Sequence, residues 1–228
     1  MAKIAIILYG APGSGKGTQA NLISQKLGLI HFDTGRFLEG IVHDPKRQKE
    51  KMVRRERKLF DAGILMTPSF VLREMAREAR AIAKARWGLI FSGSPRTIYE
   101  AKGLIPLLEK LYSKRNIFVF HLNVSPKESL ERNSRRLLCS VCHAPLLTIY
   151  YSPKTSKHCG ICGGPLYRRT IDKPEVIKVR LKQYEERTKP IFDFMQVRGY
   201  NISKINGAAP PYLVFKHIYK YLKRAKLE

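Results

Sequence analysis

The sequence contains few acidic residues and no long apolar stretch. Its longest apolar run covers only residues 4–9, whereas a membrane-spanning helix needs about 20 such residues. The N-terminus also lacks the basic start, the apolar segment and the small-residue cleavage site of a secretory signal. These absences argue against a membrane or secreted protein and predict a globular protein of the cytosol.

Acidic residues are scarce relative to basic ones: 18 Asp and Glu stand against 43 Lys and Arg, for a net charge of +25. Such a charge attracts polyanions. The densest basic run, residues 46–58, includes Glu50 and Glu56 as helical i,i+4 partners, which indicates a solvated helix face. The run lacks interleaved aromatic residues that would stack on bases, so a nucleic-acid surface is its weaker interpretation. Phosphate substrates would use only a handful of these cations, which leaves most of the excess unexplained.

The order of apolar runs predicts an α/β fold. Short apolar runs alternate with helical stretches, as in a parallel sheet with helices on both faces. The five expected strands are residues 3–9, 29–32, 88–91, 117–122 and 200–205. Two stretches interrupt the alternation: one is helical and basic, with candidate helices at 34–43, 48–62 and 67–86, and the other, residues 137–170, contains all the cysteines.

A glycine-rich segment between the first strand and the first helix has the spacing of a phosphate-binding loop. Its glycines allow backbone N–H groups to converge on phosphate oxygens, and the helix N-terminus adds a positive dipole. Lys16 is expected to reach the β and γ phosphates, and Thr18 to bind Mg²⁺. The expected ATP-binding residues of the loop are Gly10, Pro12, Gly13, Ser14, Gly15, Lys16, Gly17 and Thr18.

The cysteines form two C-x₂-C pairs separated by sixteen residues: Cys139, Cys142, Cys159 and Cys162. This spacing predicts a tetrahedral Cys₄ zinc site. Four thiolates leave no open coordination position, so the zinc would be structural and would supply folding energy to a small subdomain. Disulfides are the alternative, and a reducing cytosol disfavours them. His143 and His158 adjoin the cysteines and could substitute as ligands, although four thiols make them bystanders.

The glycine loop, in which Gly17 separates Lys16 from Thr18, resembles that of the nucleoside monophosphate kinases, and of adenylate kinases above all. Residues 33–39 occupy the place of that family's S-T-G-D-M-L-R, and residues 93–97 match its G-F-P-R-T. The resemblance covers nearly the whole chain and implies a P-loop-type five-stranded parallel sheet flanked by helices. It further implies a core of residues 1–33, 88–136 and 171–228, a helical region for the nucleoside monophosphate at 34–87, and a zinc-binding lid at 137–170.

The same resemblance implies roles for individual residues. Phosphoryl transfer needs positioning and charge neutralisation rather than a general base, so arginines and Mg²⁺ are the expected machinery. The implied catalytic residues are Lys16, Arg96, Arg136, Arg169 and Arg180. Asp172 belongs to the same lid motif as Arg169 and Arg180, and Arg132 is an implied ATP-binding residue. The implied acceptor-binding residues are Thr34, Gly35, Arg36, Gly93, Arg96 and Glu100.

Several residues depart from the family pattern. Ser92 and Arg36 stand where the family has aspartates that hold waters on Mg²⁺, and Asp33 is the expected replacement, because related shikimate kinases carry an acid near the metal. Glu39 replaces the family's acceptor-phosphate arginine, so we expect Arg36, on the same helix face, to reach that phosphate with Glu39 as its partner.

The base of the acceptor is less defined. Glu100 replaces the glutamine that reads the base in adenylate kinases, and a carboxylate favours a base edge that offers donors, such as an exocyclic amine. AMP is therefore the first candidate for the acceptor, and CMP or a broader range of acceptors is the second. In the lid, Ile171 replaces the first acid of the family's R-x-D-D, which removes a polar contact.

The leading hypothesis is therefore a monomeric enzyme, not associated with a membrane, that transfers phosphate reversibly from MgATP to a nucleoside monophosphate. With AMP as the acceptor it would produce two ADP. One alternative is a nucleic-acid-associated ATPase that binds through its zinc lid and its positive charge. Another is a nucleotide-binding protein that has lost catalysis through Ser92 and Arg36.

Overall fold

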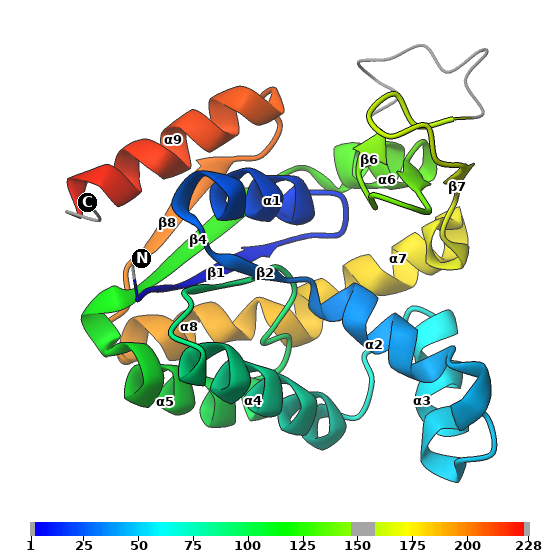
Figure 1. The fold of residues 1–228 in the computed structure, drawn as a ribbon, viewed down its shortest axis with the longest axis horizontal. Helices are drawn as coiled ribbons and strands as arrows, with labels where there is room; N and C mark the ends of the chain where they lie inside the picture. Colours follow the sequence, from blue (N-terminus) through cyan, green and yellow to red (C-terminus); the bar gives the residue numbers. More distant parts are fainter. Residues whose placement is uncertain (1–2, 147–157, 226–228) are drawn as a thin grey trace.

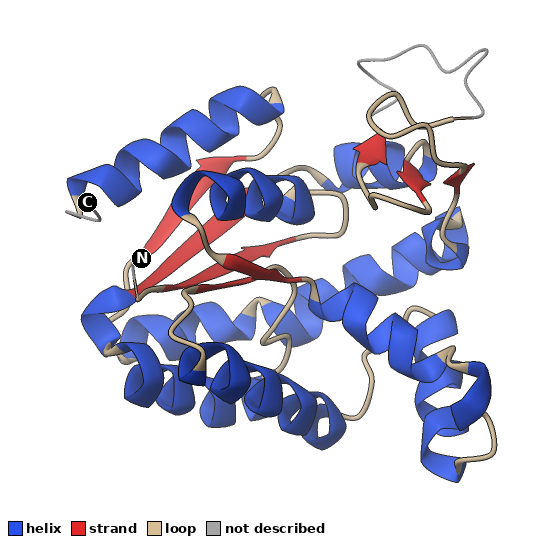
Figure 2. Cartoon of the chain, in the orientation of Figure 1, coloured by secondary structure: helices blue, strands red, loops and turns tan. Residues whose placement is uncertain are grey.

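The computed structural model describes residues 3–146 and 158–225, so the ends of the expected core and residues 147–157 of the expected lid lie outside the described residues. A parallel five-stranded sheet forms the centre, in the order β2-β3-β1-β4-β8. Its strands are β1 Ala5–Gly10, β2 Ile30–Phe32, β3 Leu89–Phe91, β4 Ile117–Asn123 and β8 Ile202–Asn206. Helices cover both faces (Figures 1 and 2), which confirms the predicted fold class.

The central strand β1 is buried along its whole length and divides the core in two. Ile6 and Leu8 point to the face covered by α1 and α9, whereas Ile7 and Tyr9 point to the face covered by α4, α5 and α8. This alternation is the period of two expected of a strand. The covering helices are α1 Lys16–Leu27, α9 Pro211–Arg224, α4 Pro68–Lys84, α5 Ile98–Tyr112 and α8 Pro190–Val197.

The basic helical region projects from one end of the sheet (Figure 1) and comprises α2 Thr34–Val42, the 3₁₀ turn η1 Pro45–Arg47 and α3 Lys51–Asp61. Glu50 pairs with Arg47 at 2.7 Å. Glu56 is not the solvated partner that the sequence predicted: it is buried, and it accepts hydrogen bonds from Thr67 N at 2.8 Å and Thr67 Oγ1 at 2.5 Å. The reason is tertiary, since this carboxylate ties α3 to the start of α4.

The cysteine-bearing insertion follows α6 Pro126–Ser134. It contains a small antiparallel sheet in the order β6-β5-β7, with β5 Leu137–Cys139, β6 Pro145–Leu146 and β7 Leu166–Tyr167. The chain returns to the core through the 3₁₀ turn η3 Thr170–Asp172, α7 Pro174–Gln183 and a π-helical turn, η4 Tyr184–Thr188. Nowhere in the described ranges is there a helix with the length and apolar character needed to cross a membrane.

Candidate active site

A cavity of about 620 Å³ opens at the carboxyl edge of the sheet. Parallel sheets bind ligands at this edge because their connecting loops and helix N-termini converge there. The glycine loop, the start of α2, the end of β3, the insertion and the α7–η4 segment all contribute to its walls. The volume falls in the range of about 300–1,000 Å³ that small-molecule sites occupy.

The glycine loop depends on backbone shapes and close approaches that only glycine allows. A Cβ at Gly10, where φ is +151°, would lie 2.6 Å from the carbonyl oxygen of Leu122, and one at Gly13 would lie 2.5 Å from Asn133 Nδ2. Gly15 then caps α1 in the left-handed conformation. Lys16 Nζ reaches back across the loop to the carbonyl oxygens of Gly10 and Ala11, at 2.7 and 2.8 Å. Contacts within the protein thus hold the shape of the loop.

Three of the predicted arginines surround Lys16. Burial lowers the pKa of Lys16 well below its usual value, and the charges of Arg96, Arg180 and Arg136 lower it further. Burial likewise lowers the pKa of Arg180 to about 9, with Arg136 and Arg96 adding to the effect. Cations crowded in a poorly solvated cavity create a strong positive potential. The site is therefore suited to a ligand with several negative charges.

Asp172 holds two of these arginines in place. Its side chain is only 3% exposed. It accepts hydrogen bonds from Arg136 Nη2 at 2.6 Å, from Arg136 Nε at 3.0 Å and from Arg180 Nη1 at 3.3 Å. A bidentate guanidinium–carboxylate pair fixes the orientation of the arginine as well as its position. Arg132 is held separately by the carbonyl oxygens of Gly207 and Ala208, at 2.8 and 3.0 Å. All three arginines line the cavity.

Arg169 forms a contact that the sequence did not predict. Its guanidinium pairs with Glu39 of α2, with only 11% and 24% of the two side chains exposed. The expected Arg36–Glu39 pair is therefore wrong, because Glu39 pairs with Arg169 at the end of the insertion. Arg36 itself is exposed, lines the cavity and has no ion pair with a described residue. The Glu39–Arg169 pair connects the helical region to the end of the insertion.

A chain of three polar side chains crosses the carboxyl ends of β2 and β3. His31 Nδ1 lies 2.6 Å from Asn21 Oδ1, and His31 Nε2 lies 2.6 Å from Ser92 Oγ. Because Asn21 Oδ1 can only accept, Nδ1 carries the proton and Nε2 accepts from the Ser92 hydroxyl. Burial lowers the pKa of His31, which favours this neutral form. No sequence pattern indicated these hydrogen bonds, since Asn21, His31 and Ser92 come from three separate segments.

Glu100, the residue expected to read the acceptor base, is not among the residues that line the cavity. Glu100 is buried, and its carboxylate accepts from Arg96 N at 2.7 Å and from Thr97 Oγ1 at 3.0 Å in the first turn of α5. Tyr9, by contrast, lines the cavity, and its buried hydroxyl has no hydrogen-bond partner among the described residues. Burial raises the pKa of Tyr9, and Glu100 raises it further. Tyr9 thus offers an unused donor that the sequence analysis missed.

The remaining predicted residues gather at the same edge. Thr18, Asp33, Gly35 and Gly93 line the cavity, whereas Thr34 is buried beside it with its hydroxyl unpaired among the described residues. Asp33 Oδ1 accepts from Arg36 N at 3.1 Å, which caps the start of α2. The described residues supply no partner for its second oxygen, so an oxygen suited to a hard cation such as Mg²⁺ remains.

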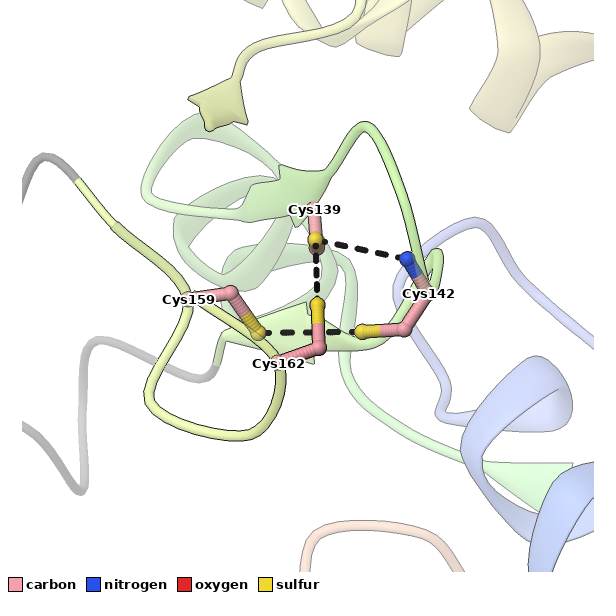
Figure 3. Close-up of side chains that lie close together, drawn as sticks. All are labelled: Cys139, Cys142, Cys159 and Cys162. Carbon is pink, nitrogen blue, oxygen red and sulfur yellow. Dashed lines mark hydrogen bonds between the residues drawn. The ribbon is translucent and has the colours of Figure 1, made fainter. Parts of the chain in front are cut away.

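The four cysteine sulfurs converge on one point (Figure 3), and all lie within 4.8 Å of one another. Cys139 Sγ is 3.4 Å from Cys162 Sγ, and Cys142 Sγ is 3.7 Å from Cys159 Sγ. A tetrahedral zinc site with bonds of about 2.3 Å separates its sulfurs by about 3.8 Å. The cluster therefore has the donors and the dimensions to hold a metal ion.

Hydrogen bonds to sulfur support the same interpretation. Burial raises the pKa of the Cys139 thiol, but the backbone N–H groups of Cys142 and Val141 donate to it and bring the pKa to about 6. Such bonds favour the thiolate, which is the form that binds metal. His158 Nδ1 lies 3.1 Å from the carbonyl oxygen of Gly163, as expected of a bystander.

Comparison with known proteins agrees with this geometry. The family model described as adenylate kinase matches residues 8–200. The chain belongs to the adenylate kinase family. It is 35% identical over 219 residues to the adenylate kinase of Methanothrix thermoacetophila, which covers 96% of this chain and 98% of the relative. It is 34% identical over 194 residues to that of Caldicellulosiruptor bescii, with 85% and 87% covered, and 31% identical over 221 residues to that of Archaeoglobus fulgidus, with 97% and 99% covered.

Membership of the adenylate kinase family confirms the resemblance inferred from the motifs, and the cysteine cluster fits the zinc-lid type. The family makes the chain a nucleotide-binding phosphotransferase. In this chain the glycine loop and the arginines of the lid motifs line one cavity. Glu39 and Ser92, two of the departures, contact residues that are distant in sequence. Glu100, a third departure, contacts Arg96 N and Thr97 at the start of α5.

Proposed function

We propose that the chain transfers the γ-phosphoryl group of MgATP reversibly to a nucleoside monophosphate, with AMP as the acceptor and two ADP as the products. The observation that carries this proposal is the meeting of the glycine loop with Lys16, Arg96, Arg136 and Arg180 in one cavity. A phosphoryl group in transfer carries charge on several oxygens, and cations held from different directions stabilise it. The names of the relatives support AMP.

We assign the donor phosphates to the loop, where backbone N–H groups, Lys16 and the N-terminus of α1 converge. Arg132 lies on the same side, beside Gly207 at the end of β8. Thr18 and Asp33 would hold Mg²⁺, which would neutralise charge on the phosphates when bound. On this side the loop follows the family's pattern, and Asp33 is the proposed departure from it.

We assign the acceptor phosphate to Arg96 and Arg36, with Thr34, Gly35 and Gly93 beside them. Arg96 Nε donates to the carbonyl oxygen of Gly93 at 2.7 Å, which leaves the outer edge of the guanidinium directed into the cavity for a phosphate. Arg169 would join this group after it leaves Glu39.

Zinc in the Cys₄ cluster would have the structural role of keeping the lid folded. We further propose that residues 34–87 and 137–170 act as the two closing parts around a core that acts as a monomer.

A panel of acceptors tests the proposal. Purified protein with MgATP should form diphosphate from AMP faster than from CMP, UMP or GMP. A higher rate with CMP, or equal rates with all four, would show an altered or broad acceptor range. ATP binding without diphosphate from any acceptor would indicate lost catalysis, and ATP hydrolysis stimulated only by RNA or DNA would indicate the nucleic-acid-associated ATPase.

A further inference from the structure

The basic residues on the protein surface lie in two different environments, one with acidic neighbours and one without. On α3 and α4 the arginines have acidic neighbours: Arg57 lies 3.5 Å from Asp61, and Arg77 lies 2.8 Å from Glu74 and 3.0 Å from Glu78. Helices α1 and α9 contain no Asp or Glu at all. The two lie beside each other on one face of the sheet, on the side opposite α4, α5 and α8 (Figure 1). The N-terminal parts of these two helices line the cavity, through residues such as Lys16 and Pro211, but the rest of this acid-free surface has no role in the proposed phosphoryl transfer.

The outward flank of α9 carries aromatic and basic residues in two rows. Its inner residues Val214, Ile218 and Leu222 are buried in the core. Residues 215, 219 and 223 form one row toward α1, and residues 212, 216 and 220 form the next, because positions four apart share a helix face. We name as the α9–α1 strip Lys26, Tyr212, Lys216, Tyr219, Lys220 and Lys223. Over residues 212–223 it runs about 17 Å along the helix.

The rings of the strip are held in place by their neighbours. Tyr219 stacks on Phe215 with centroids 5.6 Å apart and an interplanar angle of 9°. The ammonium groups of Lys26 and Lys223 lie 5.8 and 5.3 Å from the centre of the Tyr219 ring. Tyr212 is 67% exposed at one end of the strip. A surface of rings with adjacent ammonium groups can contact both the bases and the phosphates of an unpaired strand.

We infer that the α9–α1 strip binds single-stranded nucleic acid, an activity beyond the proposed phosphotransfer. An acid-free basic surface is complementary in charge to the phosphate backbone. The exposed ring of Tyr212 stacks on a base only where that base is unpaired, so the strip favours single strands over duplexes. A lipid surface is disfavoured, because the apolar residues of α9 are buried in the core and are not available for insertion.

Fluorescence anisotropy with a labelled 12-nucleotide oligouridylate tests this inference on the full chain, with saturating MgATP to keep the cavity filled. Replacing Lys216, Lys220 and Lys223 by Gln should weaken binding at least tenfold. It should also reduce the slope of log affinity against log salt by about 2, since each lost phosphate contact on a single strand contributes about 0.7. The rate of phosphoryl transfer should not change.

The matched control is the replacement of Lys46, Lys49 and Lys51 by Gln, which removes the same three charges from another exposed segment. It should weaken binding less than twofold. Equal losses in the two triple variants would overturn the inference, because they would show attraction to net charge alone.

The aromatic contribution has its own test. Tyr212→Ala should weaken oligouridylate binding about tenfold, as expected for the loss of one stacked base. Tyr99→Ala, at a tyrosine that is 56% exposed on α5, should leave binding unchanged. A duplex bound as tightly as the single strand, an unaltered affinity of Tyr212→Ala, or binding to anionic vesicles without binding to the strand would each contradict the inference.

Discussion

The two sides of the cavity are built in different ways. The donor side is mainly one continuous segment, in which Gly10, Gly13 and Gly15 shape a loop that leads directly into α1. The acceptor side is assembled from β1, α2, α5 and the end of the insertion, and one of its cations, Arg169, depends on a partner distant in sequence, Glu39. A local motif is therefore enough to identify the donor side, whereas the acceptor side can change its contacts while the fold is kept.

The strongest test of this contrast is Lys16→Ala. Loss of the only lysine within the loop should lower kcat/KM about a thousandfold, because charge on the transferred phosphoryl group loses a buried cation. Circular dichroism should remain that of the folded chain. Lys26→Ala, on the same helix but outside the cavity, is the control and should retain full transfer. Comparable activity in both variants would contradict the assignment of the donor phosphates to the loop and Lys16.

Cys159→Ser tests the lid, which serves both sides. One sulfur of the four is lost, so zinc affinity should fall at least about a hundredfold and the metal content should drop, as measured by inductively coupled plasma mass spectrometry. The melting temperature should fall with it. His158→Ala should keep one zinc per chain, since its imidazole bonds to Gly163 rather than to metal. If His158→Ala lost zinc and Cys159→Ser kept it, the Cys₄ assignment would be wrong.

Tyr9→Phe tests whether the Tyr9 hydroxyl contributes to the acceptor side. If the unpaired hydroxyl contacts the acceptor base, its removal should raise the acceptor KM about five- to tenfold and leave the ATP KM unchanged. The fold should be as stable as before or more stable, because the variant removes a buried hydroxyl that has no partner in the described part of the chain.

Tyr112→Phe is the matched control for this variant. Its hydroxyl donates to the carbonyl oxygen of Trp87 at 3.1 Å, and it does not line the cavity. It should lower the free energy of unfolding by about 1 kcal/mol with no change in either KM. An unchanged acceptor KM in Tyr9→Phe would show that Tyr9 does not contact the acceptor.

The smallest expected effect is that of Glu39→Gln. Glu39 competes with phosphate for Arg169, so neutralising it should lower the acceptor KM about two- to fivefold, in keeping with a partly exposed ion pair. Glu131→Gln, which breaks the surface pair with Arg135, should change neither KM. A higher acceptor KM in Glu39→Gln would mean instead that Glu39 holds Arg169 in its productive position.

Much of the fold could be predicted because its signals are local. The five strands lie within two residues of their expected ends, and the helices expected at 34–43, 48–62 and 67–86 correspond to α2, α3 and α4 with slightly shorter bounds. Apolar periodicity and turn residues act over a few positions, so they can be identified in sequence. The cysteine spacing is equally local, and the sulfurs converge as it predicted.

The errors concern charged and polar side chains. Glu56 was assigned to a solvated face and is buried against Thr67, and Glu39 was paired with Arg36 but contacts Arg169. Helical spacing shows which neighbours a carboxylate could reach within its own helix. It cannot show whether a distant segment offers a stronger partner in a less hydrated place.

The sequence by itself determined that this chain binds a nucleoside triphosphate and carries a four-cysteine cluster, because both depend on residues spaced closely along the backbone. The tertiary structure alone decided which distant side chains meet at the cavity, such as His31 with Ser92 and Glu39 with Arg169. It also buried the Tyr9 hydroxyl where no other described residue bonds to it. It also brought α1 and α9 together into one acid-free surface. Side chains from distant segments choose partners by proximity and desolvation, and both quantities exist only once the chain has folded.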